Sequence, residues 1–525
     1  MANRNFWAAM LAMALVFGMA VVGCDDGSQE VEKVDNTISS VSISLGSGND
    51  TPKVGRELTT TVRNTRGISV SGVSYQWKRA NSQYSTFVNI SNATSNRYTP
   101  TTEDTGRYIK VEARNSDTTY PVESSIVGPV DANQVAKPTA NPAGGDVVPG
   151  QEITLISANA TIYYTLDGTT PTSSSSSYSD YSKPKITGSC TLKAIATRSG
   201  MVDSEVLSVS YTVVAAPSFS SVTSTASIFD SSIYSVAYGD YRFVAGGSGK
   251  IAYSSNGTTW TASTGNSSFI VYGIAYGGQF VAVGSNGVIN YSSNGTSWSN
   301  VTDTTFGTSS IRDVAYGGGR YVAVGENGRI AYSTNGTSWT AATNSTYTST
   351  IYGITYGAGK FVAVGADGKM AYSTNGTSWT AVTDSTLTST IRGITYGGSS
   401  GNEKFIAVGG SSLAYSTDGV TWTKVSQYLS YGTYFNRITW GGNKYVAVAD
   451  AGVMYFSPDG ISWAKIDGGK GAGKSQMDDF DAFLFTSSIN DIAYGGGKFL
   501  VVGSKIDPDS SILFPTATGE MAISN

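Results

Sequence analysis

The sequence predicts an all-β protein whose C-terminal part, residues 217–525, folds into a β-propeller. A segment of about 40 residues recurs seven times in that part. Each copy contains four short runs of strand length, each closed by turn residues. Charged residues make up only 14% of the chain while glycine accounts for 62 positions, a composition that suits turn-dense β structure.

Two aromatic anchors define the repeat. One is a Trp that recurs at intervals of 38 to 43 residues, and the other is an aromatic residue followed by Gly in all seven copies. The Trp anchors are Trp260, Trp298, Trp339, Trp379, Trp422 and Trp463. The aromatic-Gly anchors are Tyr238, Tyr276, Tyr316, Tyr356, Tyr396, Trp440 and Tyr494. Four antiparallel strands at this period are typical of a propeller blade, so we expect seven blades.

The fourth copy shows how each blade is built. Its strands are expected at Ile351–Tyr356, Lys360–Gly365, Lys369–Ser373 and Ser378–Thr383. Asp367-Gly368 and Asn375-Gly376 join them, and such pairs favour tight hairpins in which both residues have positive φ. The second strand is continuously apolar, which predicts burial on both faces.

The two ends of the array predict that the ring is closed. The seventh copy stops at Glu520–Asn525, which aligns with the third strand of the other copies, so its fourth strand is missing. Residues 217–224 align with a fourth strand, and Phe219 takes the Trp position 41 residues before Trp260. We therefore expect residues 217–224 to complete the seventh blade and remove the exposed sheet edges.

The turn between the third and fourth strands reads Ser-x-Asn/Asp-Gly-x-Ser/Thr-Trp. This pattern resembles the Asp-box, or BNR, repeat of sialidase-like propellers over about 300 residues, although four copies have Asn in place of Asp. The resemblance implies a structural role, in which the polar side chain ties the turn and the Trp packs into the blade. The residues concerned are Asn256, Asn294, Asn335, Asn375, Asp418 and Asp459.

The N-terminus has the pattern of an export signal. Arg4 precedes an apolar run, Phe6–Val22, that is short for a membrane-spanning helix, and the run ends in Val-Val-Gly before Cys24. This ending resembles a bacterial lipobox, which implies a signal peptide over residues 1–23 and lipidation of Cys24. The alternative is an ordinary signal peptide or membrane anchor. Residues 24–38 are polar and acidic and are interpreted as a flexible tether.

Residues 39–131 have the pattern of a β-sandwich. Trp77 lies in a strand-like run, and Asp104-Thr-Gly-Arg-Tyr108 follows. The combination resembles an immunoglobulin-like domain, with Tyr108 at the tyrosine-corner position and Trp77 in the core. The usual cysteine pair is absent, and Lys110 stands where the second cysteine would fall.

Residues 136–214 predict a second small β-sandwich. The segments Tyr164-Thr-Leu-Asp-Gly-Thr-Thr-Pro-Thr172 and Lys193-Ala-Ile-Ala196 resemble the C-terminal module of chitobiase-type hexosaminidases. The resemblance implies an accessory module without catalytic residues. Cys190 lies in an apolar strand pattern and is interpreted as a small core residue.

Composition excludes several classes of function. The chain has no His and only two Cys, which removes Ser-His and Cys-His catalysis and metal sites built on those ligands. A net charge of −4 without a basic cluster argues against nucleic-acid binding. We expect no cofactor and no metal.

A glycosidase is the enzyme alternative, because sialidase-like propellers carry that chemistry. It requires a pair of carboxylates or a Tyr–Glu pair. The propeller has three Glu, namely Glu326 in a hairpin turn, Glu403 in a loop insertion and Glu520 at the end. No copy carries a distinct acid set, so we expect no enzyme.

Three insertions break the symmetry of copies five to seven, at Ser399–Glu403, Gly468–Phe485 and Lys505–Thr518. Gly468–Ser475 matches the phosphate-loop pattern G-x-x-x-x-G-K-S, but it follows a fourth blade strand and precedes an acidic run. We interpret it as a loop. Asp478, Asp479 and Asp481 are interpreted as solvated acids rather than as cation ligands.

One position varies between the copies in a way that suggests binding. It lies near the start of the first strand and holds Tyr234, Tyr272, Arg312, Tyr352, Arg392, Asn436 and Asn490. If the first strand is innermost, these residues form a ring at one mouth of the channel. Tyr and Arg favour contact surfaces; the alternative is that the ring only lines a wet channel. We therefore expect a lipid-anchored bacterial envelope protein, at the outer membrane or cell surface, that binds or scaffolds a protein or glycan.

Overall fold

The computed structural model describes residues 35–45, 51–199, 201–222, 228–265, 268–342, 347–427, 429, 432–466, 488–506 and 517–524. These residues form strands, turns and short 3-10 segments, which confirms the prediction of an all-β chain. The chain divides into two compact units: residues up to 134 together with 199–202, and residues 135–198 together with 203–525. The predicted signal peptide, with Cys24, lies outside the described residues.

No helix in the described ranges is long and apolar enough to span a lipid bilayer.

The first unit contains two small antiparallel sheets, ordered β1-β2-β5 and β4-β3-β6-β7. Their strands are β1 (Ser40–Ser44), β2 (Leu58–Arg63), β3 (Ser74–Ala80), β4 (Val88–Asn89), β5 (Arg97–Tyr98), β6 (Tyr108–Arg114) and β7 (Val122–Glu123). Trp77 is fully buried, and its Nε1 donates to the Ser95 carbonyl at 2.8 Å. The predicted core Trp is confirmed.

Asp104, in the 3-10 turn η1 (Thr102–Asp104), is a buried polar anchor of this unit. Tyr108, predicted at the tyrosine-corner position, begins β6 and is partly buried. Arg79 Nη1 donates to Asp104 at 2.9 Å, and the Tyr98 hydroxyl donates to it at 2.5 Å. These donors hold the pKa of Asp104 below its ordinary value although burial acts to raise it. A buried carboxylate is tolerated because its oxygens are hydrogen-bonded.

The second unit begins with a small sandwich that has sheets β13-β12-β15-β16-β9, β11-β8 and β10-β14. Its strands are β8 (Thr139–Asn141), β9 (Gly145–Val147), β10 (Gln151–Glu152), β11 (Thr154–Ile156), β12 (Thr161–Thr165), β13 (Ser176–Ser177), β14 (Lys185–Ile186), β15 (Cys190–Thr197) and β16 (Leu207–Val213). Cys190 is only partly buried, because it begins β15. Its interpretation as a core residue is therefore wrong.

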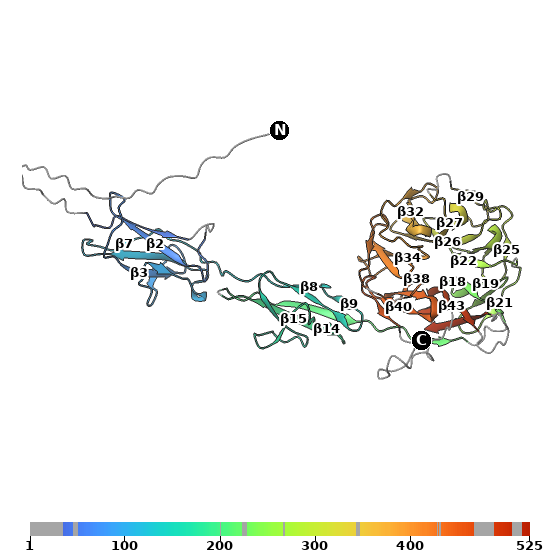
Figure 1. Ribbon diagram of the computed structural model, residues 1–525, viewed down its shortest axis with the longest axis horizontal. Coiled ribbons are helices and arrows are strands. Elements are labelled where there is room, and N and C mark those ends of the chain that lie inside the picture. Colours follow the sequence, from blue (N-terminus) through green and yellow to red (C-terminus); the bar gives the residue numbers. More distant parts are fainter. Residues whose placement is uncertain are drawn as a thin grey trace, which may run out of the picture. The chain divides into compact units, whose positions relative to one another are not determined.

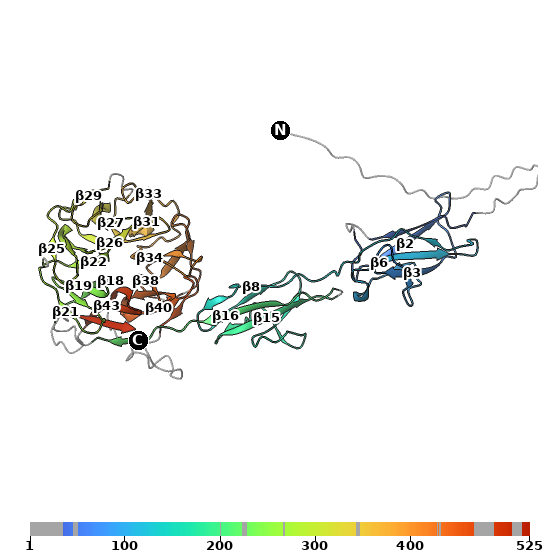
Figure 2. The same ribbon diagram turned by 180° about the vertical axis from the view of Figure 1, so that it is seen from behind.

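The rest of the second unit is a β-propeller, whose described residues form seven four-stranded antiparallel sheets. Figure 1 shows β21, β25 and β29 near the rim, with β18, β22 and β26 inside them, and Figure 2 shows the same arrangement from behind. Six of these sheets take their four strands in chain order.

The first three of the six are β18 (Ile233–Gly239), β19 (Arg242–Gly247), β20 (Ile251–Ser254) and β21 (Thr261–Ala262); β22 (Val271–Tyr276), β23 (Phe280–Gly284), β24 (Ile289–Ser292) and β25 (Ser299–Asn300); and β26 (Ile311–Gly317), β27 (Arg320–Gly325), β28 (Ile330–Ser333) and β29 (Thr340–Ala341). The other three are β30 (Ile351–Gly357), β31 (Lys360–Gly365), β32 (Met370–Ser373) and β33 (Thr380–Ala381); β34 (Gly393–Gly397), β35 (Lys404–Gly409), β36 (Ser412–Ser416) and β37 (Thr423–Lys424); and β38 (Phe435–Gly441), β39 (Lys444–Ala449), β40 (Met454–Ser457) and β41 (Ala464–Lys465).

The remaining sheet joins the two ends of the propeller sequence. It is ordered β17-β44-β43-β42, from β17 (Phe219–Ser221), β42 (Ile489–Gly495), β43 (Lys498–Ile506) and β44 (Ala517–Ser524). Phe219 pairs with Ser524 in antiparallel register. Strands β43 and β44 extend their pairing to Ile506 and Ala517, so the ends of the insertion at 505–518 lengthen a hairpin. Residues 507–516 and the insertion at 468–485 lie outside the described ranges.

The aromatic-Gly anchors hold neighbouring sheets together. A Cβ added to Gly357 would lie 2.0 Å from Cγ of Tyr396 in the next sheet, so only glycine lets the ring approach this closely. The same contact recurs from each sheet to the next, and Gly495 of the last sheet makes it with Tyr238 of the first. The second strands are buried on both faces, as predicted: Phe361–Gly365 are all buried.

The turn between the second and third strands of a sheet differs from the turn between the third and fourth strands. The turn between β31 and β32 includes η5 (Ala366–Gly368), and Asp367 and Gly368 both have positive φ, as predicted. The same 3-10 segment recurs as η3 (Ser285–Gly287), η4 (Glu326–Gly328) and η6 (Asp450–Gly452). In the next turn only Gly376 has positive φ. The expectation for Asn375 is wrong, because its side chain accepts backbone hydrogen bonds within a longer turn.

Candidate functional site

A β-bulge positions the variable side chains at the start of the inner strands. In β30, Ile351 pairs with Gly365 and Gly353 pairs with Val364, which leaves Tyr352 as the extra residue. The same register shift occurs in β18, β22, β26, β38 and β42. A bulge redirects the side chain of the extra residue away from the regular pleat. The residue that precedes the variable residue is fully buried in every copy, so the strand is packed into the core next to the point where the variable side chain leaves it.

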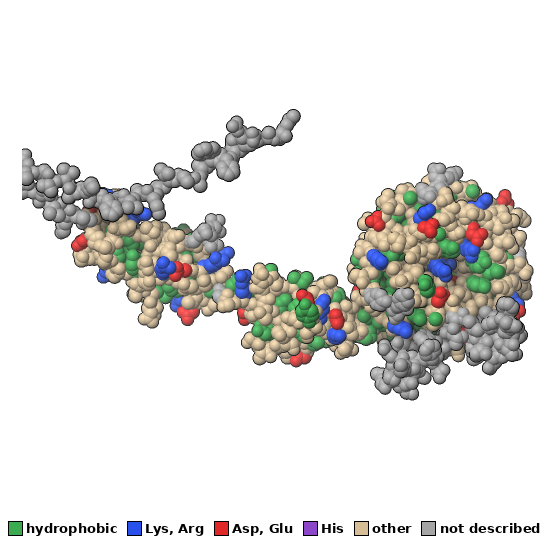
Figure 3. Space-filling view, in the orientation of Figure 1, with side chains coloured by type: hydrophobic (Ala, Val, Ile, Leu, Met, Phe, Trp, Pro, Cys, Tyr) green, Lys and Arg blue, Asp and Glu red, His purple; other side chains and the backbone are tan. Residues whose placement is uncertain are grey.

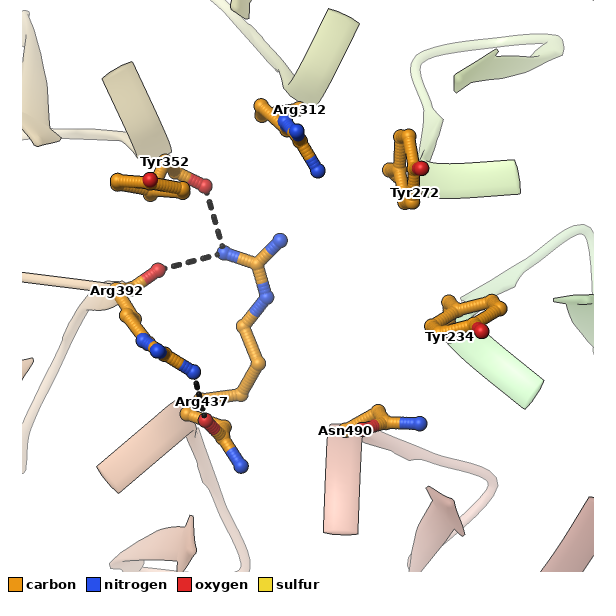
Figure 4. A pocket seen from close by; sticks show the side chains of 8 residues that line it. Tyr234, Tyr272, Arg312, Tyr352, Arg392, Arg437 and Asn490 are labelled. Carbon is orange, nitrogen blue, oxygen red and sulfur yellow. Dashed lines mark hydrogen bonds between the residues drawn. The ribbon is translucent and has the colours of Figure 1, made fainter. Parts of the chain in front are cut away.

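All seven predicted ring residues line one cavity of about 360 Å³. Figure 4 shows six of them, namely Tyr234, Tyr272, Arg312, Tyr352, Arg392 and Asn490, arranged around a common opening. An eighth residue, Arg437, also lines it. Among the residues that the structure describes, the lining therefore contains three tyrosines, three arginines, two asparagines and no carboxylate. A cavity of this size lies within the range of small-molecule sites.

Aromatic rings and a guanidinium form one side of the cavity. Tyr234 and Tyr272 meet edge to face, with ring centroids 5.9 Å apart. Arg312 lies over the Tyr272 ring, with Cζ 4.6 Å from the centroid, and also pairs with Glu326. Glu326 accepts the Ser310 amide at 3.1 Å. This side thus offers flat apolar surface beside a cation held by stacking and by an ion pair.

Amides and a second arginine form the other side. Arg392 Nη1 donates to Asn436 Oδ1 at 3.0 Å, and Asn436 Nδ2 donates to Asp450 at 2.8 Å. Asn490 Nδ2 donates to the Ile233 carbonyl at 2.9 Å, which links the last sheet to the first. No acidic side chain within the described ranges forms an ion pair with Arg392, so its charge is balanced less directly than that of Arg312.

Arg437 forms the floor of the cavity. It projects from β38 across the ring, and its Nη1 donates to the carbonyls of Tyr352 at 3.2 Å and Arg392 at 2.9 Å (Figure 4). Asp313 accepts Nη1 at 3.3 Å, and Asp491 lies 3.8 Å from Nε. One side chain thus connects five of the seven sheets.

Two largely buried carboxylates, 17% and 13% exposed, contact Arg437. Asp313 accepts the amides of Val314 and Ile354, and Asp491 accepts those of Ile492 and Val236. Burial raises the pKa of Asp313 and raises that of Asp491 to about 6, although Arg437 acts in the opposite direction on both. Both carboxylates therefore hold Arg437 although neither is among the described residues that line the cavity.

Sequence reasoning missed Arg437 and its two acids, although a signal was available. They occupy the position after the ring residue, which the other copies fill with Ser235, Gly273, Gly353 and Gly393. A small residue there allows the neighbouring strand to lie close: a Cβ added to Gly393 would lie 2.9 Å from Arg437 Cα. Two acids and one base at a position otherwise held by Gly or Ser predict an ion-pair cluster.

The six residues predicted to tie the outer turns lie away from this cavity. Asn375 Oδ1 accepts the amides of Thr377 and Ser378, and Ser373 Oγ accepts the Gly376 amide at 2.8 Å. The equivalent bonds recur at Asn256, Asn294, Asn335, Asp418 and Asp459. For Asp418, burial opposes ionisation but hydrogen bonds from Thr421 and Val420 lower the pKa to about 2.

The other sequence candidates do not meet at the cavity. Glu403 accepts the Gly401 amide within its own loop at 3.0 Å, and neither Glu403 nor Glu520 lines the cavity. Gly468–Ser475 and the acids Asp478, Asp479 and Asp481 lie outside the described residues. On the face of the propeller in Figure 3, acidic and basic side chains are interspersed among uncharged ones.

Two segments match known domain families. Residues 142–208 match the chitobiase/beta-hexosaminidase C-terminal domain, and residues 48–137 match the Ig domain of plant-specific actin-binding protein. The predicted types of these two modules are thereby supported. No curated protein matches the chain.

Several solved propellers are similar to this chain. YCF48 bound to D1 peptide is 15% identical, with a TM-score of 0.44, over 59% of this chain and 98% of that one. YCF48 from Cyanidioschyzon merolae is 15% identical, with a TM-score of 0.43, over 59% and 98%. The WD40 propeller domain of Doa1 is 12% identical, with a TM-score of 0.43, over 59% and 97%.

Proposed function

We propose that this chain is a lipid-anchored bacterial envelope protein that presents a seven-bladed propeller for non-enzymatic binding of a protein or glycan. In this proposal the seven sheets are the blades, residues 217–224 complete the seventh blade, and the outer turns are Asp-box turns. The pairing of Phe219 with Ser524 and the contact of Gly495 with Tyr238 support a closed ring.

One observation carries the binding proposal. A position that varies between the copies contributes one side chain from every sheet to a single cavity. Residues that only maintain the fold would be expected to repeat, as the outer turns do. Tyr and Arg provide contact area and directed hydrogen bonds, which suits recognition.

The charge of the lining favours binding over glycoside hydrolysis. Hydrolysis uses a pair of acids, or a Tyr with a Glu, positioned around the bond to be cleaved. Among the described residues the lining has three arginines and no carboxylate, and the neighbouring Glu326 is engaged by Arg312 and by the Ser310 amide. Loss of a glycosidase activity on changing Glu326 or Glu403 to Gln would favour the enzyme instead.

The lipid anchor rests on the sequence pattern before Cys24. Two acyl chains provide stable membrane attachment, since each buried methylene contributes about 0.8 kcal/mol. We expect cells expressing the chain to incorporate labelled palmitate into it, and Cys24→Ala to abolish the label. Equal labelling of the two forms would contradict the anchor.

The binding proposal is tested by presenting the whole chain to a glycan array and to a bacterial envelope extract. The comparison is a variant with Tyr272, Arg312, Tyr352 and Arg392 changed to Ala. We expect the unaltered chain to capture a glycan or a protein that the variant does not. Equal capture by both, or no capture in either format, would contradict a binding site at this cavity.

A further inference from the structure

The described part of the first unit begins between two loops, at the end of the sandwich that lies nearest in sequence to Cys24. One loop, residues 64–73, joins β2 to β3, and the other, residues 115–121, joins β6 to β7. Asn36 donates to the Ser71 carbonyl at 3.3 Å, and Asn115 donates to the Asn36 carbonyl at 2.7 Å. We call these two loops, together with the residue that directly precedes each of them, the tip.

Both loops of the tip have fixed shapes. Asn64 is buried, and its Oδ1 accepts the amides of Arg66 at 3.0 Å and Ile68 at 2.9 Å. In the other loop, Asn115 Oδ1 accepts the Asp117 amide at 3.2 Å. Asparagine side chains that accept amides two residues further on stabilise tight turns. The tip therefore presents its outer side chains with little ordering cost on binding.

The tip exposes apolar and cationic side chains together. Ile68 is 54% exposed and Tyr120 is 79% exposed. Three arginines are also exposed, namely Arg63, Arg66 and Arg114. Within the described part of the chain, neither Arg63 nor Arg114 forms an ion pair. Exposed Ile and Tyr beside guanidinium groups suit the boundary between hydrocarbon and anionic head groups, where Tyr rings and cations are favoured.

Charge and position distinguish the tip from other exposed parts of this unit. Asp35 and Asp117 lie at the same end, so three cations there meet two anions, in a chain whose net charge is −4. Exposure alone does not select the tip, because Tyr84 is 90% exposed. Strands β3 and β6 pair from Arg114 at the tip to Ala80 at the other end, and Tyr84 follows Ala80. Tyr84 therefore lies away from the end that leads to Cys24.

We propose that the tip docks on an anionic lipid surface beside the acyl chains on Cys24. This inference rests on the lipid anchor of the proposed function. The segment from Cys24 to Asp35 spans at most about 40 Å when fully extended, so the tip stays within reach of the bilayer. Attachment through so short a segment gives an effective concentration of about 1 mM, at which a contact too weak to hold the free chain on a membrane is still populated.

The test measures hydrogen exchange by mass spectrometry on the mature chain, residues 24–525, attached to vesicles. With Cys190→Ser, a maleimide lipid couples Cys24 directly, so the result does not depend on lipidation in cells. On vesicles of phosphatidylglycerol and phosphatidylcholine, we expect exchange in both loops of the tip to slow by about twofold or more relative to the same chain capped at Cys24 in solution, since half-occupancy of the docked state halves the exposure of these amides. High salt, or phosphatidylcholine alone, should reduce the effect.

Two pairs of substitutions assign the contact. Ile68→Ser with Tyr120→Ser removes the apolar part, and Arg63→Gln with Arg114→Gln removes two charges. Each pair should abolish most of the slowing on anionic vesicles. Tyr84→Ser, which changes an exposed aromatic residue at the other end, is the matched control and should leave it unchanged. Exchange of each variant in solution checks that the loops keep their shape.

The inference is overturned if the tip exchanges equally on anionic vesicles and in solution, if the turn containing Tyr84 is slowed as much as the tip, or if neither pair of substitutions reduces the slowing. Slowing that requires an added envelope extract would assign the tip to a protein partner and would also overturn it. These results are separable from failure of the anchor. A chain that takes up no palmitate in cells but docks when coupled through Cys24 loses the anchor and keeps the lipid-binding tip.

Discussion

The outer turns and the inner mouth of the propeller differ in how they use the repeat. In each of the six outer turns, the glycine amide donates to a serine hydroxyl at 2.8 Å. At the mouth, the corresponding residue changes from Tyr to Arg to Asn around the ring. The same bulge occurs in six of the seven copies and carries all three residue types, so the backbone repeats where the side chain does not. The repeated residues form the sheets and turns, and the residues that vary line the cavity.

The position that follows the ring residue in the sequence shows a second difference from the outer turns. Four copies have Gly or Ser, and three have Asp313, Arg437 and Asp491. The three charged residues meet across the channel although they lie in different sheets. A charged residue at this position in one copy therefore requires residues of opposite charge at the same position in other copies. The outer turns have no such requirement, because the Ser and Asn or Asp side chains of each turn accept their hydrogen bonds within the same copy.

The largest expected effect comes from breaking that match. Arg437→Met leaves Asp313 and Asp491 buried without their cation, and removal of one partner from a buried ion pair typically costs about 3–5 kcal/mol. Urea unfolding monitored by tryptophan fluorescence measures the change. Adding Asp313→Asn and Asp491→Asn to Arg437→Met should recover most of the loss. A loss below about 1 kcal/mol for the single change would mean that the cluster is solvated.

The next largest effect tests the repeated contact between sheets. Gly357→Ala places a methyl group 2.0 Å from Tyr396 Cγ, and overpacking of this kind typically costs about 1–3 kcal/mol. The same unfolding experiment applies. Tyr396→Ala in the same chain removes the clash, so the double variant should be more stable than the sum of the two single effects implies. Simple additivity would argue against the contact.

A smaller effect is expected at an outer turn. Asn375→Ala removes the acceptor of two backbone amides and should cost about 1 kcal/mol. Asn375→Asp should be nearly neutral at pH 7, because Asp418 and Asp459 accept the same bonds in their own copies. Equal destabilisation by Ala and by Asp would show that shape, rather than the acceptor, matters there.

Much of the fold was predictable because it repeats. The aromatic anchors gave the sheet order, and the alignment of residue 219 with the Trp position anticipated its pairing at the C-terminus. The ring residues were identifiable because they vary at a fixed register. The bulge that redirects them was not, because no residue type marks it. Arg437 was missed because its role depends on two acids distant in sequence.

Lowering the pH should change the contributions of Asp491 and Asp418 to the free energy of unfolding in opposite directions. An Asp in an unfolded chain has a pKa of about 3.9. Asp491 has its folded pKa raised to about 6, so its contribution to stability grows as pH falls from 7 to 4. Asp418 has its pKa lowered to about 2, so the stability it contributes above pH 4 is lost as pH falls toward 2. The exposed position of Asp418 makes its effect the weaker one.

Asn substitutions separate these two contributions. The unfolding free energy of Asp491→Asn relative to the unaltered chain should change between pH 7 and pH 4, and that of Asp418→Asn should change between pH 4 and pH 2. Slopes of the same sign at both sites would contradict the contrast between buried and turn-bound carboxylates.

The smallest effect on stability is expected at the ring itself. Tyr352 is partly exposed, and its bulge is anchored by the buried Ile351. Tyr352→Ala should therefore change the unfolding free energy by no more than about 0.5 kcal/mol. A loss comparable to that of Gly357→Ala would assign the ring to the fold rather than to a site.

The central claim, that repetition carries the fold and variation carries binding, is tested most directly by measuring capture and stability on the same two samples. One sample is the ring variant, with Tyr272, Arg312, Tyr352 and Arg392 changed to Ala, and the other is an outer-turn variant with Asn335 and Asn375 changed to Ala. We predict that the ring variant loses capture of the glycan or envelope protein while its unfolding free energy stays closer to that of the unaltered chain, and that the turn variant loses stability while retaining capture. A ring variant that still captures the ligand, or a turn variant that loses capture while folded, would contradict the claim.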